Sequence, residues 1–368
     1  MPALAHGLPL AEIQRRIGLL IHNLVELKDE SGEFLLRLED GRVIDTKGWN
    51  DWEWTHGIGL YGILKFYEQT DDARCLQIMR DWFSNRFAAG TPTKNVNTMS
   101  PFLTLAYLYE EFGDKTYLPY LDTWAEWIMR EMPRTEEGGL QHIVFNSENR
   151  QQLWDDTLMM SVLPLAKISL LLDRPEYVED AKRQFLIHIK YLFDRKTGLW
   201  FHGWSFEGRH NFAEALWARG NCWVTIAIPE FIELLDLPPG DSLRQFLLDT
   251  LEAQVRTLAK HQDASGLWHT LVMDDTSYLE ASATAGFAYG ILKAVRKGYL
   301  DKRYEEVGVK AVKGVLANIS DNGELKSVSF GTAMGDTLQF YKDIPLTAMP
   351  YGQSLAILCL AEFMRTYI

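Results

Sequence analysis

Short polar turns recur between apolar segments along most of the chain, and this repeat most constrains what the chain can fold into. The turns are Gln69–Cys75, Glu111–Tyr117, Leu172–Tyr177, Leu237–Ser242 and Tyr299–Tyr304. After a shorter first spacing they return about every 60 residues, which is the pattern of an array of two-helix units. The repeat therefore predicts helical pairs rather than a mixed α/β fold.

A second series of motifs lies between these helical pairs. Each begins with a glycine turn and continues with a few alternating residues: Gly138–His142, Thr197–Gly203, Ser265–Thr270 and Asn322–Ser327. Such motifs are typical of a short strand or β-hairpin. We expect these loops to carry small strands.

The predicted helices are of two kinds. Segment 177–192 has apolar residues three and four apart with charged residues between them, whereas segments 160–172, 221–235 and 282–295 are apolar on nearly all sides. Alternation of amphipathic and fully apolar helices indicates two layers. Six or so pairs closing on themselves would form an all-α (α/α)6 barrel with the glycine-aromatic loops at one mouth. A linear solenoid fits the repeat as well, but would not need so many apolar helices. We expect one domain over residues 1–368.

Composition narrows the function classes. The formal net charge is −13 and no run of Lys or Arg is present, which argues against a nucleic-acid partner. The 12 Trp residues fit an aromatic-lined sugar groove as well as an ordinary large core. We expect the three dispersed cysteines to be buried free thiols. The N-terminal segment does not read as a signal peptide and no apolar run reaches membrane-spanning length, so we expect a cytoplasmic protein.

One motif imitates a nucleotide site. Gly57–Gly62 matches G-x-G-x-x-G, but the dinucleotide fingerprint requires a preceding apolar strand within a βαβ unit. A helix pair follows here, so we interpret the glycines as points of close helix packing. No metal-binding or nucleophile-elbow motif is present, and we expect neither a metal nor a cofactor.

The stretch Gln151–Met160 places two adjacent aspartates, Asp155 and Asp156, in what looks like a continuous apolar helix. Neighbouring residues on a helix point about 100° apart, so the two carboxyls would face different surroundings. Burial raises the pKa of a carboxyl group, and a raised pKa is what a general acid needs near neutral pH. The alternative is that these residues only cap a helix N-terminus.

Further polar and aromatic candidates gather in the inter-pair loops and at the starts of the apolar helices. They are Trp54, His56, Asn97, His142, Trp154, His202, Trp217, Arg219 and Trp223. Arg219 and Trp223 are four residues apart and would share a helix face, so the guanidinium could clamp a sugar carboxylate. Each residue alone is more commonly a packing residue. The barrel, however, would bring them all to one mouth.

Several motifs together resemble glycoside hydrolase family 105, the unsaturated rhamnogalacturonyl hydrolases, to which family 88, the unsaturated glucuronyl hydrolases, is related. They are NDWEWTHGIGLYG, KNVNTMSPFLTL, QLWDDTLMM, GLWFHGW, LWARGNCW, SYLEASATAGFAYG and PYGQSLAILCLAEF, and they span about Trp49 to Glu362 in the family's order. The resemblance implies an (α/α)6 barrel and metal-free hydration chemistry.

The substrate implied by the resemblance is a lyase product with a C4=C5 double bond in its terminal uronic acid. An aspartate protonates C4, water adds at C5, and the resulting hemiketal opens and releases the neighbouring sugar. The aspartate that precedes Thr in W-x-D-T performs this step in the family, and here it is Asp156. It also orients or deprotonates the water.

Other roles carry over residue by residue. Trp217, Arg219 and Trp223 match the family's W-A-R-G-N-x-W, whose aromatics line the sugar site and whose Arg meets the uronate, and His142 and His202 lie in loops like the family's pocket loops. Relatives often have a second aspartate where this chain has Asn97. An amide can bind a hydroxyl group but cannot raise the pKa of Asp156 by charge repulsion.

The residues leave two other functions open. One is a sugar epimerase of the N-acylglucosamine 2-epimerase type, which is also an (α/α)6 barrel and would use paired histidines as acid and base. The other is a non-catalytic toroid that binds oligosaccharides or a protein. The sequence leaves open which sugar follows the uronate, and whether the protein is a monomer or a small homo-oligomer.

Overall fold

Twelve long helices form the body of the protein in a computed structural model that describes residues 4–37, 41, 43–331 and 333–367. Six of these helices are inner: α2 (Trp54–Thr70), α4 (Phe102–Phe112), α6 (Leu163–Leu171), α8 (Ala218–Leu234), α10 (Ala281–Arg296) and α13 (Pro350–Tyr367). Six are outer: α1 (Leu10–Glu26), α3 (Ala73–Ala89), α5 (Leu118–Arg130), α7 (Pro175–Leu192), α9 (Ser242–His261) and α11 (Glu305–Ala317). Short helical turns are η1 (Asn97–Met99), η2 (Leu158–Val162), η3 (Lys302–Tyr304) and α12 (Leu338–Lys342).

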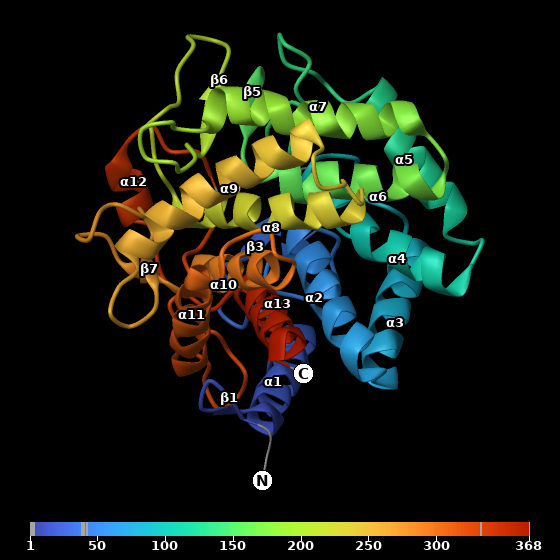
Figure 1. Cartoon of the computed structure of the whole chain (residues 1–368). Coiled ribbons are helices and arrows are strands. Elements are labelled where there is room, and N and C mark those ends of the chain that lie inside the picture. The colour runs from blue at the N-terminus through green and yellow to red at the C-terminus, as the bar shows by residue number, and fades with distance from the viewer. Residues whose placement is uncertain (1–3, 38–40, 42, 332, 368) are drawn as a thin grey trace.

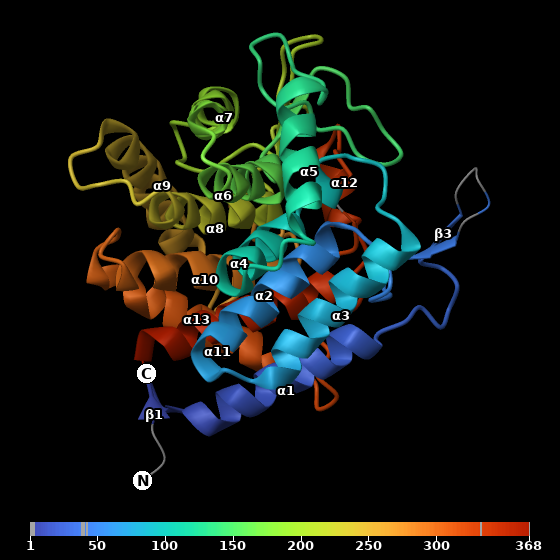
Figure 2. The ribbon, with the colours of Figure 1, turned by 90° about the vertical axis from the view of Figure 1, so that its right-hand side faces the viewer.

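The inner helices close into a ring. Each inner helix packs against the next, and α13 packs against both α10 and α2. Each outer helix packs on the inner helix of its pair, with α1 from the start of the chain covering α13 from its end. Figures 1 and 2 show the two chain ends on the same side of the molecule. The predicted (α/α)6 barrel is confirmed, and closure of the ring rules out the linear solenoid.

Burial follows the two-layer prediction. In α10 every residue from Ala281 to Ala294 is buried, whereas α7 buries one face and exposes the other. Small residues allow the inner helices to approach closely: a Cβ on Gly290 would lie 2.2 Å from the Thr225 carbonyl oxygen of α8. The glycines of the G-x-G-x-x-G motif serve the same purpose, since a Cβ on Gly57 would lie 2.2 Å from the Ser100 hydroxyl oxygen.

Four two-stranded antiparallel sheets decorate the helices: β1 (Leu4–Ala5) with β2 (Leu8–Pro9), β3 (Leu35–Arg37) with β4 (Val43–Asp45), β5 (Gln152–Trp154) with β6 (Gly203–Ser205), and β7 (Trp268–His269) with β8 (Leu279–Glu280). The hairpin β7–β8 lies in the connection between α9 and α10, and only β7 falls in the predicted motif Ser265–Thr270. In contrast, β5 and β6 belong to consecutive loops and pair in the register Gln152 with Ser205. These strands line the mouth at which the inner helices begin.

The segment before α6 is not the continuous helix that its apolar character suggested. Gln152–Trp154 form β5, Asp155 and Asp156 lie in a turn, and Leu158–Val162 form the π-helical turn η2. The helical prediction fails here because pairing with β6 takes the backbone hydrogen bonds of β5. The capping alternative is not supported either, because η2 has no side-chain hydrogen bond at its N-cap.

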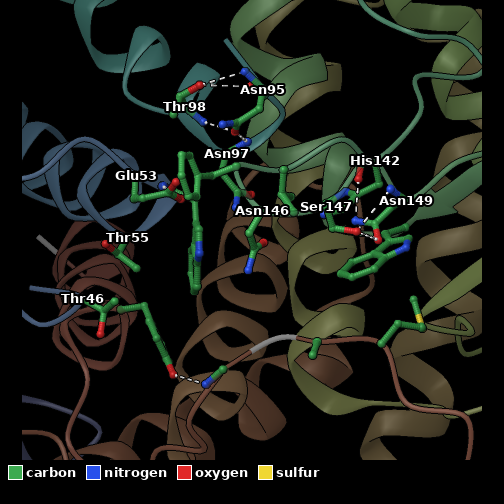
Figure 3. A pocket seen from close by; sticks show the side chains of 18 of the residues that line it. Thr46, Glu53, Thr55, Asn95, Asn97, Thr98, His142, Asn146, Ser147 and Asn149 are labelled. Atoms are coloured by element: carbon green, nitrogen blue, oxygen red, sulfur yellow. Dashed lines mark hydrogen bonds between the residues drawn. The ribbon is translucent and has the colours of Figure 1, made fainter. Parts of the chain in front are cut away.

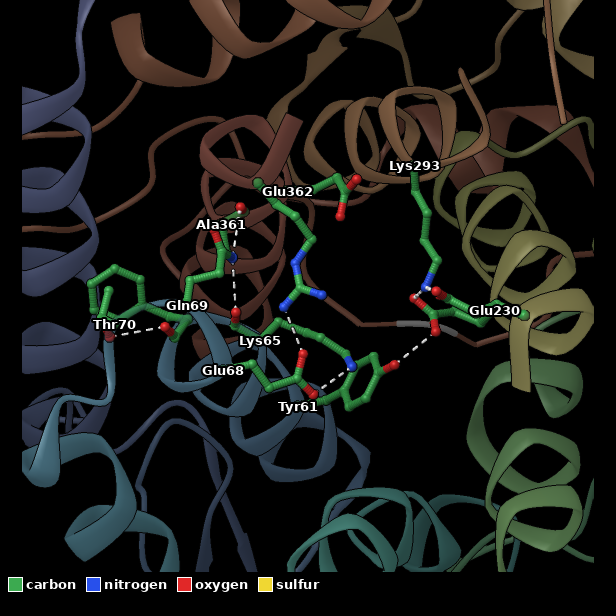
Figure 4. Close-up of polar contacts among 12 residues, drawn as sticks. Tyr61, Lys65, Glu68, Gln69, Thr70, Glu230, Lys293, Ala361 and Glu362 are labelled. Atoms are coloured by element: carbon green, nitrogen blue, oxygen red, sulfur yellow. Dashed lines mark hydrogen bonds and ion pairs between the residues drawn. The ribbon is translucent and has the colours of Figure 1, made fainter. Parts of the chain in front are cut away.

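Charged residues occupy the opposite end of the barrel, where the inner helices end. A cavity of about 300 Å³ is lined there by side chains that include Lys65, Lys293, Arg296 and Glu362. The Lys293 ammonium lies 2.6 Å from a carboxylate oxygen of Glu230 (Figure 4). Cations near helix C-termini offset the negative ends of the helix dipoles. The two mouths of the barrel therefore have different chemistry.

Two further observations concern the described residues as a whole. Cys75, Cys222 and Cys359 are buried free thiols, as predicted. Within the described ranges no helix has the length and apolar character needed to cross a membrane, and no group of three or more His, Cys, Asp or Glu side chains is placed to hold a metal ion.

Candidate active site

A cavity of about 660 Å³ opens at the mouth where the inner helices begin. Five of the predicted site residues line it: Trp54, His56, Asn97, His142 and Trp154. Figure 3 shows Asn97 and His142 on opposite sides of this space, with Asn146 between them. The prediction that loops and helix starts far apart in sequence meet at one place is thus confirmed for these five residues.

Asp156 lies next to His142 at this mouth. It is 5% exposed, and its Oδ1 atom lies 3.4 Å from Nδ1 of His142 without forming a hydrogen bond to any described side chain or backbone group. Burial raises the pKa of Asp156 from 3.8 to about 7, although its own backbone amide and the positive charge of Arg219 oppose the rise. The carboxyl group is therefore poised to hold and release a proton near neutral pH.

Asp155 has a different environment. Its side chain is fully buried, and neither carboxyl oxygen has a hydrogen-bond partner among the described residues. Burial, together with the nearby charge of Asp156, raises the pKa of Asp155 well above its usual value. A Cβ on Gly220 of α8 would lie 2.4 Å from Oδ2 of Asp155, so the carboxyl group fills the space that this glycine leaves. Asp155 is a buried neutral acid that fixes the turn.

Two neutral histidines flank the Trp154 indole. The His142 ring stacks on Trp154 at 4.1 Å between centroids, and His202 meets the same indole edge-to-face at 5.2 Å. Burial lowers the pKa of His142 well below its usual value and that of His202 to about 3. Nδ1 of His142 is 2.8 Å from the Thr157 hydroxyl, which holds the imidazole beside Asp156.

The Arg219 side chain makes its contacts within the protein. Its guanidinium donates to the Ser329 carbonyl at 2.9 Å and to the Gly331 carbonyl, and it lies 4.7 Å from the centroids of the Trp217 and Tyr351 rings. The side chain is fully buried. In this structure Arg219 holds Ser329 and Gly331 at the cavity rim and does not itself line the cavity.

The remaining predicted aromatics form a buried wall. Trp54, the first residue of α2, stacks on Tyr351 at 4.8 Å and meets Trp223 edge-to-face at 5.7 Å. Trp217 and Trp223 are each 1% exposed. Trp54 and Tyr351 reach the cavity, whereas Trp223 supports them from behind.

The role of His56 is largely structural. Its Nε2 atom is 2.8 Å from the Gly48 carbonyl oxygen, and its Nδ1 accepts a hydrogen bond from the backbone of Glu53 in a capping box. Both ring nitrogens are thus engaged by the chain. Its place at the cavity follows from holding the start of α2 there.

The sequence did not single out Glu53 and Tyr351, which line the cavity, nor a further group of lining residues: Phe330, Gly331, Ala333, Met334 and Asp336. Tyr351 was present in the quoted motif PYGQSL, and Glu53 in NDWEWTHG. Their position at the cavity depends on closure of the ring, which brings α13 beside α2. No local pattern could have shown this.

A ring of helical pairs, an aromatic-walled cavity and a buried acid at its edge define an (α/α)6 carbohydrate-active hydrolase. The family model for Glycosyl Hydrolase Family 88 matches residues 27–367. The chain therefore belongs to Glycosyl Hydrolase Family 88 and is a glycoside hydrolase, which confirms the resemblance to the unsaturated-uronyl families and sets aside the epimerase and the non-catalytic toroid.

Individual relatives agree with this membership. The unsaturated rhamnogalacturonyl hydrolase YesR of Bacillus subtilis (strain 168) is 32% identical over 319 residues, covering 86% of this chain and 90% of YesR. The crystal structure of a possible member of the GH105 family from Salmonella enterica is 62% identical, with a TM-score of 0.98, and covers 100% of this chain and 97% of that one. Unsaturated glucuronyl hydrolase from Bacillus sp. GL1, at 16% identity and a TM-score of 0.70 over 95% of this chain and 96% of that one, shares the fold.

Proposed function

We propose that the protein removes the 4,5-unsaturated uronic acid from lyase-generated oligosaccharides, with unsaturated galacturonyl-rhamnose as the preferred substrate. The observation that carries the proposal is Asp156, a buried carboxyl group with a pKa of about 7 that lies directly behind His142 in the wall of the aromatic-lined cavity. The 32% identity to an unsaturated rhamnogalacturonyl hydrolase supports the choice of sugar. The whole chain, residues 1–368, serves as one catalytic domain.

The proposed reaction begins with a proton on Asp156. The carboxyl group gives this proton to C4, the C4=C5 double bond becomes a C4–H bond, and positive charge spreads over C5 and the ring oxygen. Water adds at C5 and gives a proton back to the Asp156 carboxylate, so that the enzyme is restored. The hemiketal then opens the ring, and the second sugar leaves from C1. The anomeric carbon is never attacked, so the two-carboxylate geometry of ordinary glycosidases does not apply.

The groups around Asp156 set its surroundings and do not transfer protons themselves. His142 is neutral and stacked on Trp154, so it packs beside the carboxyl group without adding a charge. The charge of Arg219 opposes the rise of the Asp156 pKa and favours the carboxylate that forms when the proton is transferred. The cavity's polar wall, which includes Asn97 and Asn146, supplies neutral hydrogen-bonding groups for the sugar.

The uronate carboxylate meets an unusual environment in this proposal. None of the described residues that line the cavity is a Lys or an Arg. Several inner helices begin at this mouth, and helix N-termini favour negative charge. We infer that backbone dipoles and neutral donors, rather than a cationic side chain, receive the carboxylate.

The test is product analysis on a panel of disaccharides in deuterated water. We expect unsaturated galacturonyl-rhamnose to be cleaved fastest, with one deuterium at C4 of the released uronate at early times, and its saturated counterpart to stay intact. Faster cleavage of an unsaturated glucuronyl disaccharide would move the specificity but keep the chemistry. Cleavage of the saturated sugar at a similar rate would overturn the proposal.

A further inference from the structure

A second carboxyl group, Glu53, lines the cavity and takes no part in the proposed proton transfer. Glu53 is the N-cap residue of α2, and its Oε2 atom accepts a hydrogen bond from the Trp54 backbone amide at 3.3 Å. The Asn97 side chain, from η1, lines the same cavity and is near enough to this carboxyl group to lower its pKa. Figure 3 shows Glu53 and Asn97 on the side of the cavity away from His142.

The electrostatics of Glu53 show that it is more than an exposed cap. Burial and the nearby negative charge of Asp51 together raise the pKa of Glu53 from 4.5 to about 7, and the Trp54 amide and the nearby Asn97 side chain oppose the rise. A surface capping carboxylate would remain solvated and have an ordinary pKa. Glu53 is half-buried and lines the cavity, so an acid with a raised pKa faces the space that a substrate would fill.

The two side chains complement a sugar diol. A carboxylate offers about four acceptor positions, and the Trp54 backbone amide uses one of them in Glu53. The Asn97 side-chain amide offers an acceptor oxygen and donor hydrogens beside it. An unsaturated uronate has lost its C4 hydroxyl but keeps the neighbouring hydroxyls at C2 and C3. Hydrogen bonds from hydroxyls to a carboxylate in a partly dehydrated site are stronger than hydrogen bonds between two neutral groups.

We propose that Glu53, paired with Asn97, is a substrate-binding residue that accepts hydrogen bonds from the C2 and C3 hydroxyls of the unsaturated uronate. This inference rests on the proposed function. It assigns the recognition of the ring to the wall formed by α2 and η1, and the proton transfer to Asp156 across the cavity. Because the carboxyl group is needed for binding rather than for the chemical step, its loss affects KM more than kcat.

The test moves the carboxyl group from residue 53 to residue 97, which lines the same cavity. Glu53→Gln is expected to raise KM at least tenfold with kcat within threefold of the natural protein. The double variant Glu53→Gln/Asn97→Asp returns a carboxylate to the pair from the other side, and we expect it to bring KM back to within threefold. A capping role could not be restored in this way, because residue 97 is not at the N-cap of α2.

Asp72→Asn is the matched control, since Asp72 caps α3 through the Arg74 amide and does not line the cavity in the described structure. It should leave KM and kcat unchanged.

If thermal unfolding shows that Glu53→Gln folds poorly, a second variant replaces it. Asn97→Ala leaves the capping box intact and should raise KM at least fivefold. An unchanged KM in the folded Glu53→Gln variant, or no recovery in the double variant, would overturn the inference while turnover by the natural protein still upheld the proposed function. Absence of turnover by the natural protein on every unsaturated disaccharide would instead defeat the proposed function.

Discussion

At the scale of single residues, the central fact is that burial alone brings the pKa of Asp156 near neutrality. No second carboxylate is needed to repel it, because removal from water is the main cause of the rise. Asn97 in place of a second aspartate is therefore compatible with a working acid. The neighbouring Asp155, with its more strongly raised pKa, stays neutral and adds no charge to the site.

The first prediction concerns the pH dependence of activity. The reaction requires Asp156 to be protonated, and its pKa is about 7, so kcat/KM should fall about tenfold per pH unit above that value. Initial rates measured between pH 5 and 9 on the unsaturated disaccharide test this. A profile that stays flat to pH 9 would show that protonated Asp156 is not required.

The second prediction concerns stability. The folded pKa of Asp156 lies above its unfolded value of about 3.9, so the folded state holds its proton more tightly and loses stability as pH rises from about 4 to 7. The full effect is about 4 kcal/mol. Asp156→Asn removes it, and its thermal unfolding midpoint should exceed that of the natural protein at pH 8 and approach it at pH 4. A variant less stable at pH 8 would contradict the assignment of the pKa.

Some features of the candidate site can be inferred from local sequence, whereas others depend on contacts between distant residues. Asp156 could be selected because its motif and its apolar surroundings indicate the same acid. Arg219 was expected to face the substrate. Its hydrogen-bond partners Ser329 and Gly331 are more than 100 positions away in the sequence, so no local pattern could predict these bonds. Glu53 was missed because a lone acid before a helix reads as a cap.

At the scale of elements, the position of the acid depends on the contact between the 155–156 turn and the start of α8. Gly220 leaves room for the Asp155 carboxyl group, and β5 is held by its pairing with β6. The π-helical turn η2 follows directly, and such irregular turns are common at functional sites. The turn is thus held between the start of α8 and the paired strands β5 and β6.

The third prediction tests the packing of the Asp155 carboxyl group against Gly220. Gly220→Ala would place a Cβ 2.4 Å from Oδ2 of Asp155, which should destabilise the protein by about 1–3 kcal/mol and shift Asp156. We expect kcat/KM to fall at least tenfold. Gly18→Ala in α1 is the matched control, because a Cβ there meets nothing within 4 Å and should leave activity unchanged. Equal effects of the two substitutions on kcat/KM would refute the account of the turn.

Helices were the most predictable elements, since periodic apolar patterns are local. The β5 segment was not, because a three-residue strand is defined by a partner about 50 positions away. The apolar residues around Asp155 and Asp156 therefore looked helical until the ring placed consecutive loops side by side.

At the scale of the whole molecule, the barrel separates two kinds of electrostatics. The mouth at the helix starts is lined by neutral donors and acids, whereas the opposite mouth gathers Lys and Arg with paired Glu residues. Although burial alone would raise the pKa of Glu230, the Lys293 ammonium holds it below its usual value. The charged residues at the far end are therefore engaged in ion pairs with one another, away from the candidate active site.

The fourth prediction follows from this division. Lys293→Met leaves the buried Glu230 carboxylate without its cation and should cost about 3–5 kcal/mol of unfolding free energy. The activity per folded molecule should stay unchanged, because the pair lies at the end away from the site. Lys302→Met, whose side chain is 87% exposed, should change stability by less than about 0.5 kcal/mol. Denaturant unfolding measures the stability of each variant, and active-site titration of the same samples gives the activity per folded molecule. Loss of turnover in folded Lys293→Met would contradict the separation between the ion-pair end and the active site.

The measurement that tests the central claim most directly is the near-ultraviolet absorbance of unsaturated galacturonyl-rhamnose mixed with the natural protein and with Asp156→Asn. The C4=C5 enol ether absorbs in this range and its hydration product does not. We predict a steady fall with the natural protein and a rate at least 1000-fold lower with the folded variant, since removal of a required proton donor costs at least about 10³. A comparable fall with Asp156→Asn would contradict the assignment of the acid.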